Sequence, residues 1–259
     1  MKKTEVHGEL TGAGVGRYAV WHNLGLTTAS GRDNMMRDQQ LLNKVEAGDI
    51  QCPILRLYLW QKPTVSLGLN QSRDSVVNLA RLQELDYDIV RRPTGGRALL
   101  HKGDLCYALL GRKDWHPEFR SLTSTYRAVG EALRLALDML GVDLVKLESE
   151  SERRRDEASP CFAMYSPFEV SVAGRKICGS AQRRLRSGFL QHGSLRLADC
   201  WTDDDLQAIW PQSVTIQAAQ TTSLESELGH KSDPDEVSEV LLRAFADTFQ
   251  VEILGVSAE

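Results

Sequence analysis

The sequence has no long hydrophobic run, because no apolar stretch approaches the ~20 residues that cross a bilayer. Two lysines near the start, in MKKTEVHGEL, are not followed by an apolar segment, so we expect no secretory signal. An excess of positive charge is also missing, since 31 lysines and arginines face 35 acidic residues and the net charge is −4. This balance argues against bulk electrostatic binding to nucleic acid. We therefore expect a cytoplasmic protein that acts on neither membranes nor nucleic acids.

Paired cysteines are absent as well. The cysteines are five in number, scattered, and form no CxxC motif: Cys52, Cys106, Cys161, Cys178 and Cys200. Such an odd set supports neither a disulfide framework nor a zinc site, so we expect no bound metal. In a reducing compartment these residues are free thiols, and we expect most of them to be small buried hydrophobes. A catalytic role therefore has to be argued for one particular cysteine.

The composition is that of a globular protein, with 42% hydrophobic and 25% charged residues among 259. Hydrophobic periodicity predicts helices over 33–45, 76–85, 123–140 and 234–249. It predicts strands over 16–23, 54–60, 65–69, 88–91, 98–100, 105–110, 168–172, 176–182, 189–197 and 251–254. The strands at 98–100 and 105–110 are expected to pair around a turn at Lys102-Gly103. No linker divides the chain, so we predict one α+β domain over 17–259 with a mixed sheet, after an N-terminal arm at 1–16.

The segment RRPTGGRALLH, from Arg91 to His101, is the first that suggests a binding site. Paired glycines allow the backbone to approach a ligand and to expose its N–H groups. The arginines on either side of the turn place cations that suit a phosphate or a carbonyl oxygen. The alternative is a tight glycine turn with solvated arginines. A phosphate-binding P-loop is excluded, because its GxxxxGK[ST] pattern is missing.

Two further segments carry a lysine and a cysteine. Lys176 begins the strand KICGSAQ after a hairpin turn, and next to an arginine-rich loop it could donate to an acyl carbonyl. Cys161 directly follows the charged stretch 148–160, which we interpret as a mobile loop. Nearby cations would favour its thiolate, the nucleophile in acyl transfer. The alternatives are a solvated lysine and an inert buried thiol, and Cys178 is the rival nucleophile.

Two histidines have motif-like surroundings, His192 in QHGS and His101 at the end of the glycine segment. Either is a candidate general base for Cys161, although a lone histidine in a strand is more often structural. The CGSCW-type context of papain-like proteases is absent, which disfavours that class.

In this order, these segments resemble the lipoate ligase and octanoyltransferase family. The shared stretches are DNMMRDQQLL, PTVSLGLNQ, RRPTGGRALLH, LCYALL, GRKICGSAQRR and FLQHGSLRL, and the similarity extends from Tyr18 to Phe249. Pro160-Cys161-Phe162 resembles the cysteine loop of the LipM-type octanoyltransferases within that family. The resemblance implies a mixed sheet flanked by helices, akin to the catalytic domain of biotin ligases.

The same resemblance implies a ping-pong reaction that needs no cofactor. Cys161 would take the octanoyl group from octanoyl-acyl carrier protein, and a lysine of a lipoyl domain or of the glycine cleavage H protein would then receive it. Lys176 would hold the carbonyl oxygen. The residues implied to bind substrate are Arg91, Arg92, Thr94, Gly95, Gly96, Arg97, His101, Gly179, Ser180, Ala181 and His192.

Some features leave alternatives open. Lys102 stands where the family often has aspartate, and Cys106 where its strand usually reads LTYS, which we expect to change contacts near the site. An acidic carrier protein could bind to a group of arginines, namely Arg183, Arg184 and Arg186 with 153–155. The alternative is that these are solvated surface arginines. An ATP-dependent lipoate ligase, an amidotransferase between lipoyl domains, and a non-catalytic binding module remain as other functions.

Overall fold

A computed structural model of the chain describes residues 19–72, 77–143, 170–209 and 221–256. The larger of its two sheets has seven strands in the order β10-β1-β2-β6-β9-β8-β7. Their bounds are β1 Val20–Ala29, β2 Ile54–Trp60, β6 Asp104–Arg112, β7 Val170–Val172, β8 Arg175–Arg184, β9 Gly188–Arg196 and β10 Glu252–Gly255. The pairs β10–β1 and β1–β2 are parallel and the other pairs are antiparallel, so the predicted mixed sheet is confirmed.

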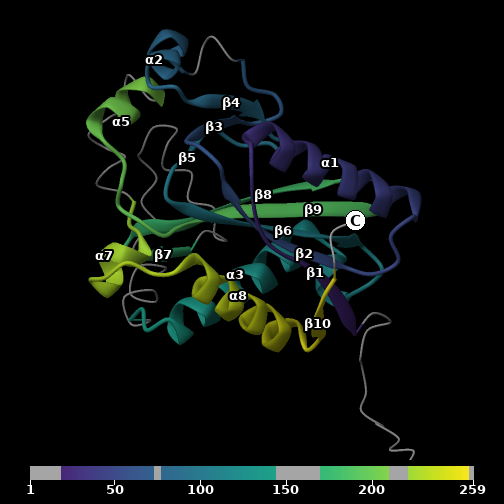
Figure 1. The fold of residues 1–259 in the computed structure, drawn as a ribbon. Helices are drawn as coiled ribbons and strands as arrows, with labels where there is room; N and C mark the ends of the chain where they lie inside the picture. The colour runs from purple at the N-terminus through teal and green to yellow at the C-terminus, as the bar shows by residue number, and fades with distance from the viewer. Residues whose placement is uncertain (1–18, 73–76, 144–169, 210–220, 257–259) are drawn as a thin grey trace, which may run out of the picture.

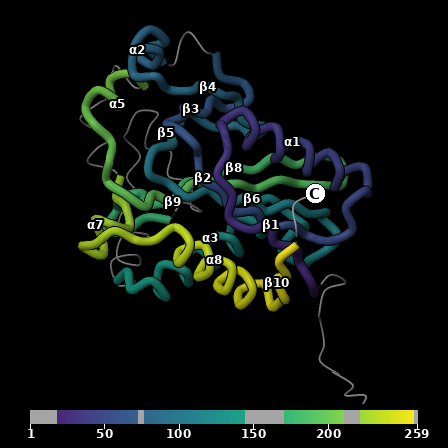
Figure 2. The backbone as a smooth tube through the Cα atoms, viewed as in Figure 1, coloured from purple at the N-terminus to yellow at the C-terminus, as the bar shows by residue number. Residues whose placement is uncertain are grey.

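Helices cover both faces of this sheet (Figure 1). Helix α1 (Gly31–Ala47) lies on one face, and α3 (Leu122–Met139) and α8 (Pro234–Phe249) pack together on the other. The helix starts follow from local capping, since the side chains of Ser30, Ser121 and Asp233 accept backbone N–H groups in the first turns. Figure 2 shows the last strand, β10, beside the first strand, β1, with which it pairs. No helix among the described residues is long and apolar enough to span a membrane.

A second, three-stranded sheet lies beside the N-terminal end of α1. It contains β3 (Thr64–Leu67), β4 (Asp88–Arg91) and β5 (Leu99–His101) in the order β4-β3-β5. Its own small core includes residues of α2 (Leu79–Glu84) and α5 (Asp203–Ile209), among them Leu82, Leu206 and Ile209. The segment 92–97 follows β4, so the glycine turn of the sequence leaves this small sheet.

Two predictions about strands are wrong. The first strand was expected to end at Asn23, yet β1 continues to Ala29, because the Asn23 side chain caps Gly25 within a bulge and pairing with β2 then resumes. Strands β5 and β6 do not pair with each other. The left-handed turn at Gly103 passes the chain from the small sheet to the large one, where β6 pairs with β2 and β9.

The short elements were not predicted. Hydrophobic periodicity does not indicate α5, α7 (Leu224–Leu228) or the 3-10 turn η1 (Pro117–Phe119), and α2 begins three residues later than its predicted start. The predicted arm at 1–16 and the loop at 148–160 lie outside the described residues.

Lys102, one of the departures from the family pattern, links α5 to the small sheet through an ion pair and a hydrogen bond. Its Nζ lies 2.8 Å from a carboxylate oxygen of Asp205 and 3.0 Å from the Tyr87 hydroxyl. Burial alone raises the pKa of Asp205, but hydrogen bonds from Lys102, Tyr87 and Thr202 outweigh it and hold the pKa below the usual 3.8. The stabilisation is therefore present above pH 3.8 and is lost as the pH falls through the lower pKa of the folded state.

We expect Lys102→Ala to lower the free energy of unfolding by about 3 kcal/mol, because the Asp205 carboxylate would stay buried without its cation. Urea denaturation at pH 7 measures the change. The control is Lys62→Ala, which removes ion pairs with the exposed Asp86 and Asp88 and should cost no more than about 1 kcal/mol. Equal losses in the two variants would show that the buried pair does not stabilise α5.

Candidate functional site

The loop 92–97 is held from inside by one arginine. Arg92 is 8% exposed, and its Nη1 donates to the Ser66 carbonyl at 2.9 Å and to the Ser66 hydroxyl at 3.1 Å. Its Nε and Nη2 donate to the Gly95 carbonyl, and Nη2 also donates to the Arg97 carbonyl at 2.7 Å. Burial lowers the pKa of Arg92 to about 10, so the guanidinium remains charged at neutral pH. Arg92 therefore fixes the shape of the loop, and its side-chain N–H groups donate to oxygens of the protein itself.

This arrangement turns the loop carbonyls inward and two N–H groups outward. The Thr94 carbonyl accepts from the Leu69 N–H at 2.8 Å, and the Gly95 carbonyl accepts from Arg92. Because the peptide bonds are trans, the N–H groups of Gly95 and Gly96 point the opposite way, and both residues are exposed. Within the described residues neither N–H has a hydrogen-bond acceptor. Two adjacent donors of this kind can bind a phosphate or a developing oxyanion.

The loop also depends on the absence of a side chain at Gly68. A Cβ added there would lie 1.9 Å from the Gly96 carbonyl oxygen, so backbone would have to move. We expect Gly68→Ala to lower the free energy of unfolding by about 3 kcal/mol. An alanine at Gly95 would meet no atom within 4 Å and should change it by less than about 1 kcal/mol. Thermal or urea unfolding of both variants checks this, and two equally stable variants would refute the contact.

A buried chain of polar contacts fastens the loop to the large sheet. The Thr94 hydroxyl lies 2.7 Å from His192 Nε2, and His192 Nδ1 lies 3.0 Å from Asp38 Oδ2 on α1. The other Asp38 oxygen accepts from Arg56 Nη1 at 2.7 Å, and Arg56 also donates to the side-chain oxygen of Asn34. All five side chains are buried, so α1, β2, β9 and the loop share one network.

The sheet face beneath the loop carries several of the predicted site residues. Ala181 lies opposite His192 and Gly179 opposite Ser194 in the β8–β9 ladder, and directly paired residues project to the same side. A Cβ added at Gly179 would lie 2.7 Å from Cε and 3.0 Å from Nζ of Lys176. The Lys176 amine therefore lies on the same face of the sheet as His192, over the space that Gly179 leaves open.

Ser180 is not on this face. Its hydroxyl lies 2.6 Å from the Tyr107 hydroxyl, and the Tyr107 ring packs against Phe245 of α8, on the side of the sheet away from the loop. The structure thus brings Lys176, Gly179 and Ala181 together with His192 but directs the Ser180 side chain elsewhere, as the alternation of a strand requires.

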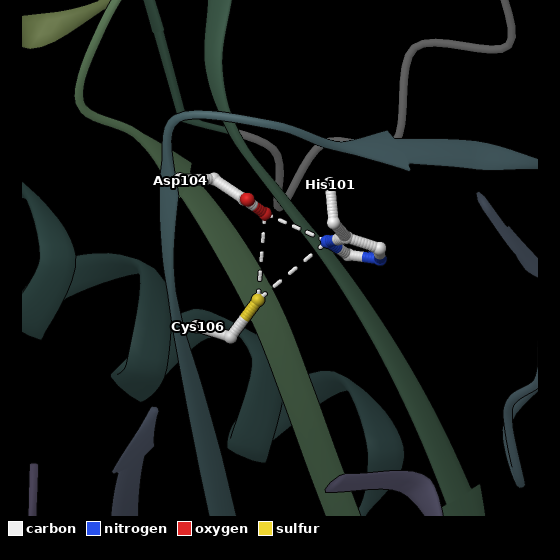
Figure 3. A group of neighbouring side chains, drawn as sticks. All are labelled: His101, Asp104 and Cys106. Atoms are coloured by element: carbon white, nitrogen blue, oxygen red, sulfur yellow. Dashed lines mark hydrogen bonds and ion pairs between the residues drawn. The ribbon is translucent and has the colours of Figure 1, made fainter. Parts of the chain in front are cut away.

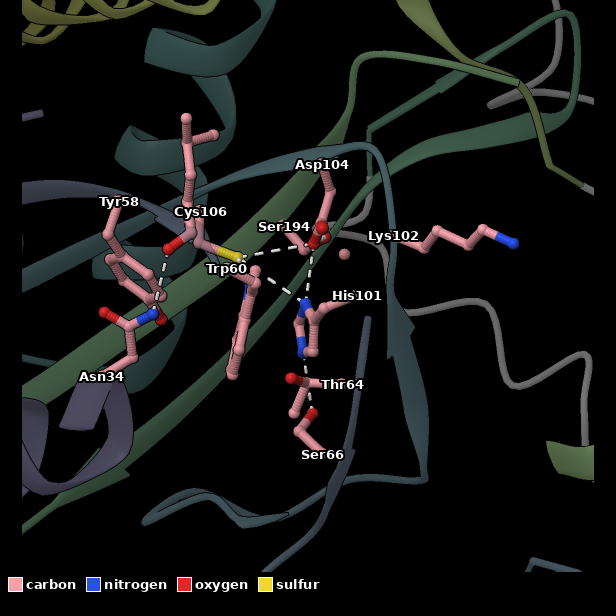
Figure 4. A network of polar contacts seen from close by, with 12 residues as sticks. Asn34, Tyr58, Trp60, Thr64, Ser66, His101, Lys102, Asp104, Cys106 and Ser194 are labelled. Carbon is pink, nitrogen blue, oxygen red and sulfur yellow. Dashed lines mark hydrogen bonds and ion pairs between the residues drawn. The ribbon is translucent and has the colours of Figure 1, made fainter. Parts of the chain in front are cut away.

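His101 belongs to a second buried network, shown in Figures 3 and 4. Its Nδ1 lies 2.7 Å from Asp104 Oδ2, and this oxygen also accepts from the Ser194 hydroxyl at 2.5 Å and from the Cys106 thiol at 3.5 Å. His101 Nε2 lies 2.9 Å from the hydroxyl of Ser66, which in turn accepts from Arg92. Lys102 points away from this cluster in Figure 4 and has no part in it.

His101, Asp104 and Cys106 also have the side chains of a metal site, since their ligand atoms lie within 4.8 Å of one another. The 2.7 Å between nitrogen and oxygen is, however, a hydrogen-bond distance, and the oxygen already has other donors. Burial, with the Asp104 charge as the next cause, raises the pKa of the Cys106 thiol well above its usual value, which disfavours the thiolate that metals require. The cluster fits a hydrogen-bonded network better than a metal centre.

A pocket of about 380 Å³ borders this network on the side of the β5–β6 turn. Its lining residues are Leu59, Trp60, Gln61, Lys62, Pro63, His101, Lys102, Gly103, Asp104, Leu197, Ala198, Lys231, Ser232 and Pro234. Trp60 stacks on the His101 ring with centroids 4.0 Å apart and donates to the Cys106 sulfur. None of the glycine-loop residues lines this pocket.

Comparison with known proteins places this geometry in a family. Residues 30–246 match the lipoyl protein ligase A/B catalytic domain. The octanoyltransferase LipM of Moorella thermoacetica is 32% identical to the chain, over 90% of this chain and 88% of the relative. The chain belongs to the lipoyl protein ligase A/B catalytic domain family. The octanoyltransferase LipM of Carboxydothermus hydrogenoformans is 35% identical over 68% of this chain, and that alignment spans 64% of the relative's length.

A solved structure has the same fold as this chain. A crystal structure of lipoate-protein ligase A bound with ATP has a TM-score of 0.73 and covers 92% of this chain and 88% of that protein, at 22% identity. A likeness at this identity establishes the shared fold. It confirms the α+β domain with a mixed sheet and flanking helices that the sequence segments implied.

The arginines that were candidates for binding partners or substrate have several internal contacts. Arg91 donates to the carbonyls of Gly68 and Leu69 at 2.8 and 2.9 Å. Arg183 donates to the Pro93 carbonyl, and Arg184 to the carbonyls of residues 119 and 120. Arg97 and Arg186 are exposed, while 153–155 and Cys161 lie outside the described residues. The guanidiniums of Arg91, Arg183 and Arg184 thus hold loops of the protein itself.

Two charged residues beneath the histidines, Asp38 and Arg56, are not among the residues predicted from the sequence. Asp38 lies within the apolar stripe of α1, with Met35, Leu42 and Val45 at helical spacing, and Arg56 interrupts the apolar strand ILRLYLW. A charged residue inside a hydrophobic pattern indicates a buried partner, and this signal could have identified both. The partnership itself joins residues far apart in the chain and is visible only in the fold.

Proposed function

We propose that this octanoyltransferase takes the octanoyl group of octanoyl-acyl carrier protein onto Cys161 as a thioester and passes it to a lysine of a lipoyl domain or of the glycine cleavage H protein. Curated relatives across nine tenths of the chain are octanoyltransferases, which supports octanoyl transfer in protein lipoylation. The observation that carries the chemistry is the Lys176 amine over Gly179, on the sheet face beneath the glycine loop.

Each step of this reaction balances without a further reactant. The Cys161 thiol gives up its proton, and its thiolate attacks the carbonyl carbon of the donor thioester. The C–S bond to Cys161 forms as the C–S bond to the carrier breaks, and the carrier leaves as a thiol that takes up the released proton. The neutral amine of the acceptor lysine then attacks the acyl-enzyme, an amide forms, and the Cys161 thiol is regenerated. Two thioesters are of similar energy and an amide is more stable, so no ATP is consumed.

Both steps place negative charge on the carbonyl oxygen, and the site supplies positive partners for it. The Lys176 ammonium and the outward N–H groups of Gly95 and Gly96 are donors of the kind that stabilise an oxyanion. The rigid loop lets these donors act without reorganisation. Apolar contact with the acyl chain would come from the Gly179 and Ala181 side of β8.

The test is reconstitution of the full transfer. The enzyme is mixed with octanoyl-acyl carrier protein and a lipoyl domain or H protein, without ATP, and the acceptor mass is followed. We expect an increase by one octanoyl group per acceptor. Product only from free octanoate with ATP would identify a ligase, and product only from an octanoylated lipoyl domain would identify an amidotransferase.

A further inference from the structure

Two buried chains of the same kind support the glycine loop from different sides, one directly and one through Arg92. In one, Asp38 contacts His192 at 3.0 Å, and His192 contacts the Thr94 hydroxyl at 2.7 Å. In the other, Asp104 contacts His101 at 2.7 Å, and His101 contacts the hydroxyl of Ser66 at 2.9 Å. Each chain therefore runs from a carboxylate through an imidazole to a hydroxyl, and every member is at least nine-tenths buried.

The carboxylates decide how the two imidazoles are protonated. A carboxylate can only accept a hydrogen bond, so the Nδ1 of each histidine carries a proton and donates to Asp38 or Asp104. In the neutral ring Nε2 is then an acceptor, and the hydroxyl of Thr94 or Ser66 donates to it. With the other tautomer, the ring and the carboxylate would face each other as two acceptors.

The hydroxyls of Thr94 and Ser66 connect the two histidines to the loop, so the direction of their hydrogen bonds affects its backbone. Thr94 is itself a loop residue, and its carbonyl is held by the Leu69 N–H at 2.8 Å. Ser66, with its proton directed to His101, presents oxygen lone pairs to Arg92 Nη1 at 3.1 Å, and Arg92 holds the Gly95 carbonyl, which shares its peptide bond with the outward Gly96 N–H. The direction of the Gly95 and Gly96 N–H groups thus depends on both carboxylates.

We propose that Asp38 and Asp104 are positioning residues for acyl transfer, which set the tautomers of His192 and His101 and thereby aim the Gly95 and Gly96 N–H groups at the reacting carbonyl. This rests on the proposed function for the nature of the ligand. It assigns the two histidines to the support of the loop and not to proton transfer with substrate, since both rings have partners on both nitrogens.

Asp38→Asn tests the first chain, with Asp205→Asn as the matched control. Both carboxylates are buried and bonded to a cation, but among the described residues the hydrogen-bond partners of Asp205 are Tyr87, Lys102 and Thr202, which lie outside the loop. We expect Asp38→Asn to slow single-turnover acylation by an octanoyl thioester about 100-fold, with KM within about threefold. Asp205→Asn should lose stability but acylate within about twofold of the wild-type rate. Equal acylation rates in wild type and Asp38→Asn would overturn the proposal.

If Asp38→Asn does not fold, Thr94→Val and Thr94→Ser test the same chain at its other end. Valine removes only the hydroxyl and serine restores it, so we expect slow acylation in the first and recovery in the second. Wild-type rates in both would overturn the proposal.

Nitrogen NMR of the wild-type histidine rings separates this proposal from the proposed function. We expect Nδ1–H tautomers for His101 and His192, whether or not the enzyme is acylated. Acylation of the wild type by the thioester establishes the proposed function independently. If no acylation occurs, the proposed function fails, and Nε2–H tautomers would then overturn the positioning roles as well.

Discussion

Replacing Cys161 by alanine is expected to reduce octanoyl transfer at least about 1000-fold, because no other group in the proposed mechanism can carry the acyl chain as a thioester. The rate is measured with octanoyl-acyl carrier protein and a lipoyl domain under multiple turnover. The donor should still bind, since Cys161 contributes bond formation and not the bulk of the contact with the carrier protein. Circular dichroism of the variant checks that the fold is retained.

Cys178→Ala is the matched control for this loss. Cys178 is 2% exposed and belongs to the core beneath β7 and β8, so a substrate carbonyl has no access to its sulfur. We expect the variant to keep its turnover within about threefold and to lose about 1 kcal/mol of stability for the shortened side chain. An inactive Cys178→Ala enzyme together with an active Cys161→Ala enzyme would identify Cys178 as the nucleophile.

Replacing Lys176 by methionine is expected to lower kcat by about 100- to 1000-fold, which is the loss seen when one donor to an oxyanion is removed. Methionine keeps the length and apolar character of the side chain. The backbone of Lys176 pairs with β7 and accepts from the Thr222 N–H, so the strand should remain in place. Single-turnover acylation, followed by mass, separates this effect from a loss of acceptor binding.

Gly179→Ala moves the same amine without removing it. The new methyl group would lie 2.7 Å from Lys176 Cε, and the flexible end of the lysine can move aside at little cost in stability. We expect acylation to slow by about 10- to 100-fold, while the free energy of unfolding changes by less than about 1 kcal/mol. Full activity in Gly179→Ala with no activity in Lys176→Met would mean that the position of the amine over Gly179 is not the reactive one.

Much of the fold is local and was therefore predictable. Helices α3 and α8 have strong periodicity, a capping residue at each start and Leu or Phe at core spacing, and the observed ranges lie within one residue of the predicted ones. The hairpin between β7 and β8 follows from Ala173 and Gly174, which take the two positive φ values of a tight turn.

The wrong predictions concern elements whose structure depends on contacts between residues far apart in the sequence. Asn23 and Gly25 have the composition of a turn, and only pairing with β2 and β10 makes them a bulge inside one long strand. Strands β5 and β6 are adjacent in sequence, which favours a hairpin, but Leu99 and Leu100 pair with β3 of the small sheet. The short α5 is stabilised by the ion pair between the buried Asp205 and Lys102. Because these residues are far apart in the sequence, no local pattern predicts the pair.

The candidate site likewise has residues that a local sequence motif indicates and residues that only the fold brings together. Thr94, Gly95 and Gly96 have a recognisable segment, and Lys176 has its own, so both were predicted with their neighbours. The role of Arg92 differs from the expected one, because its guanidinium turns inward to the loop carbonyls. The support by Asp38 depends on α1 crossing β9, a contact between residues 154 positions apart.

The most direct test of the central claim is an intact mass spectrum of the enzyme after mixing with octanoyl-acyl carrier protein in the absence of ATP, followed by peptide mapping. We expect a single octanoyl adduct on the peptide that contains Cys161, sensitive to hydroxylamine as a thioester is, and discharged when a lipoyl domain is added. An enzyme that remains unmodified while the acceptor becomes octanoylated would contradict the covalent mechanism.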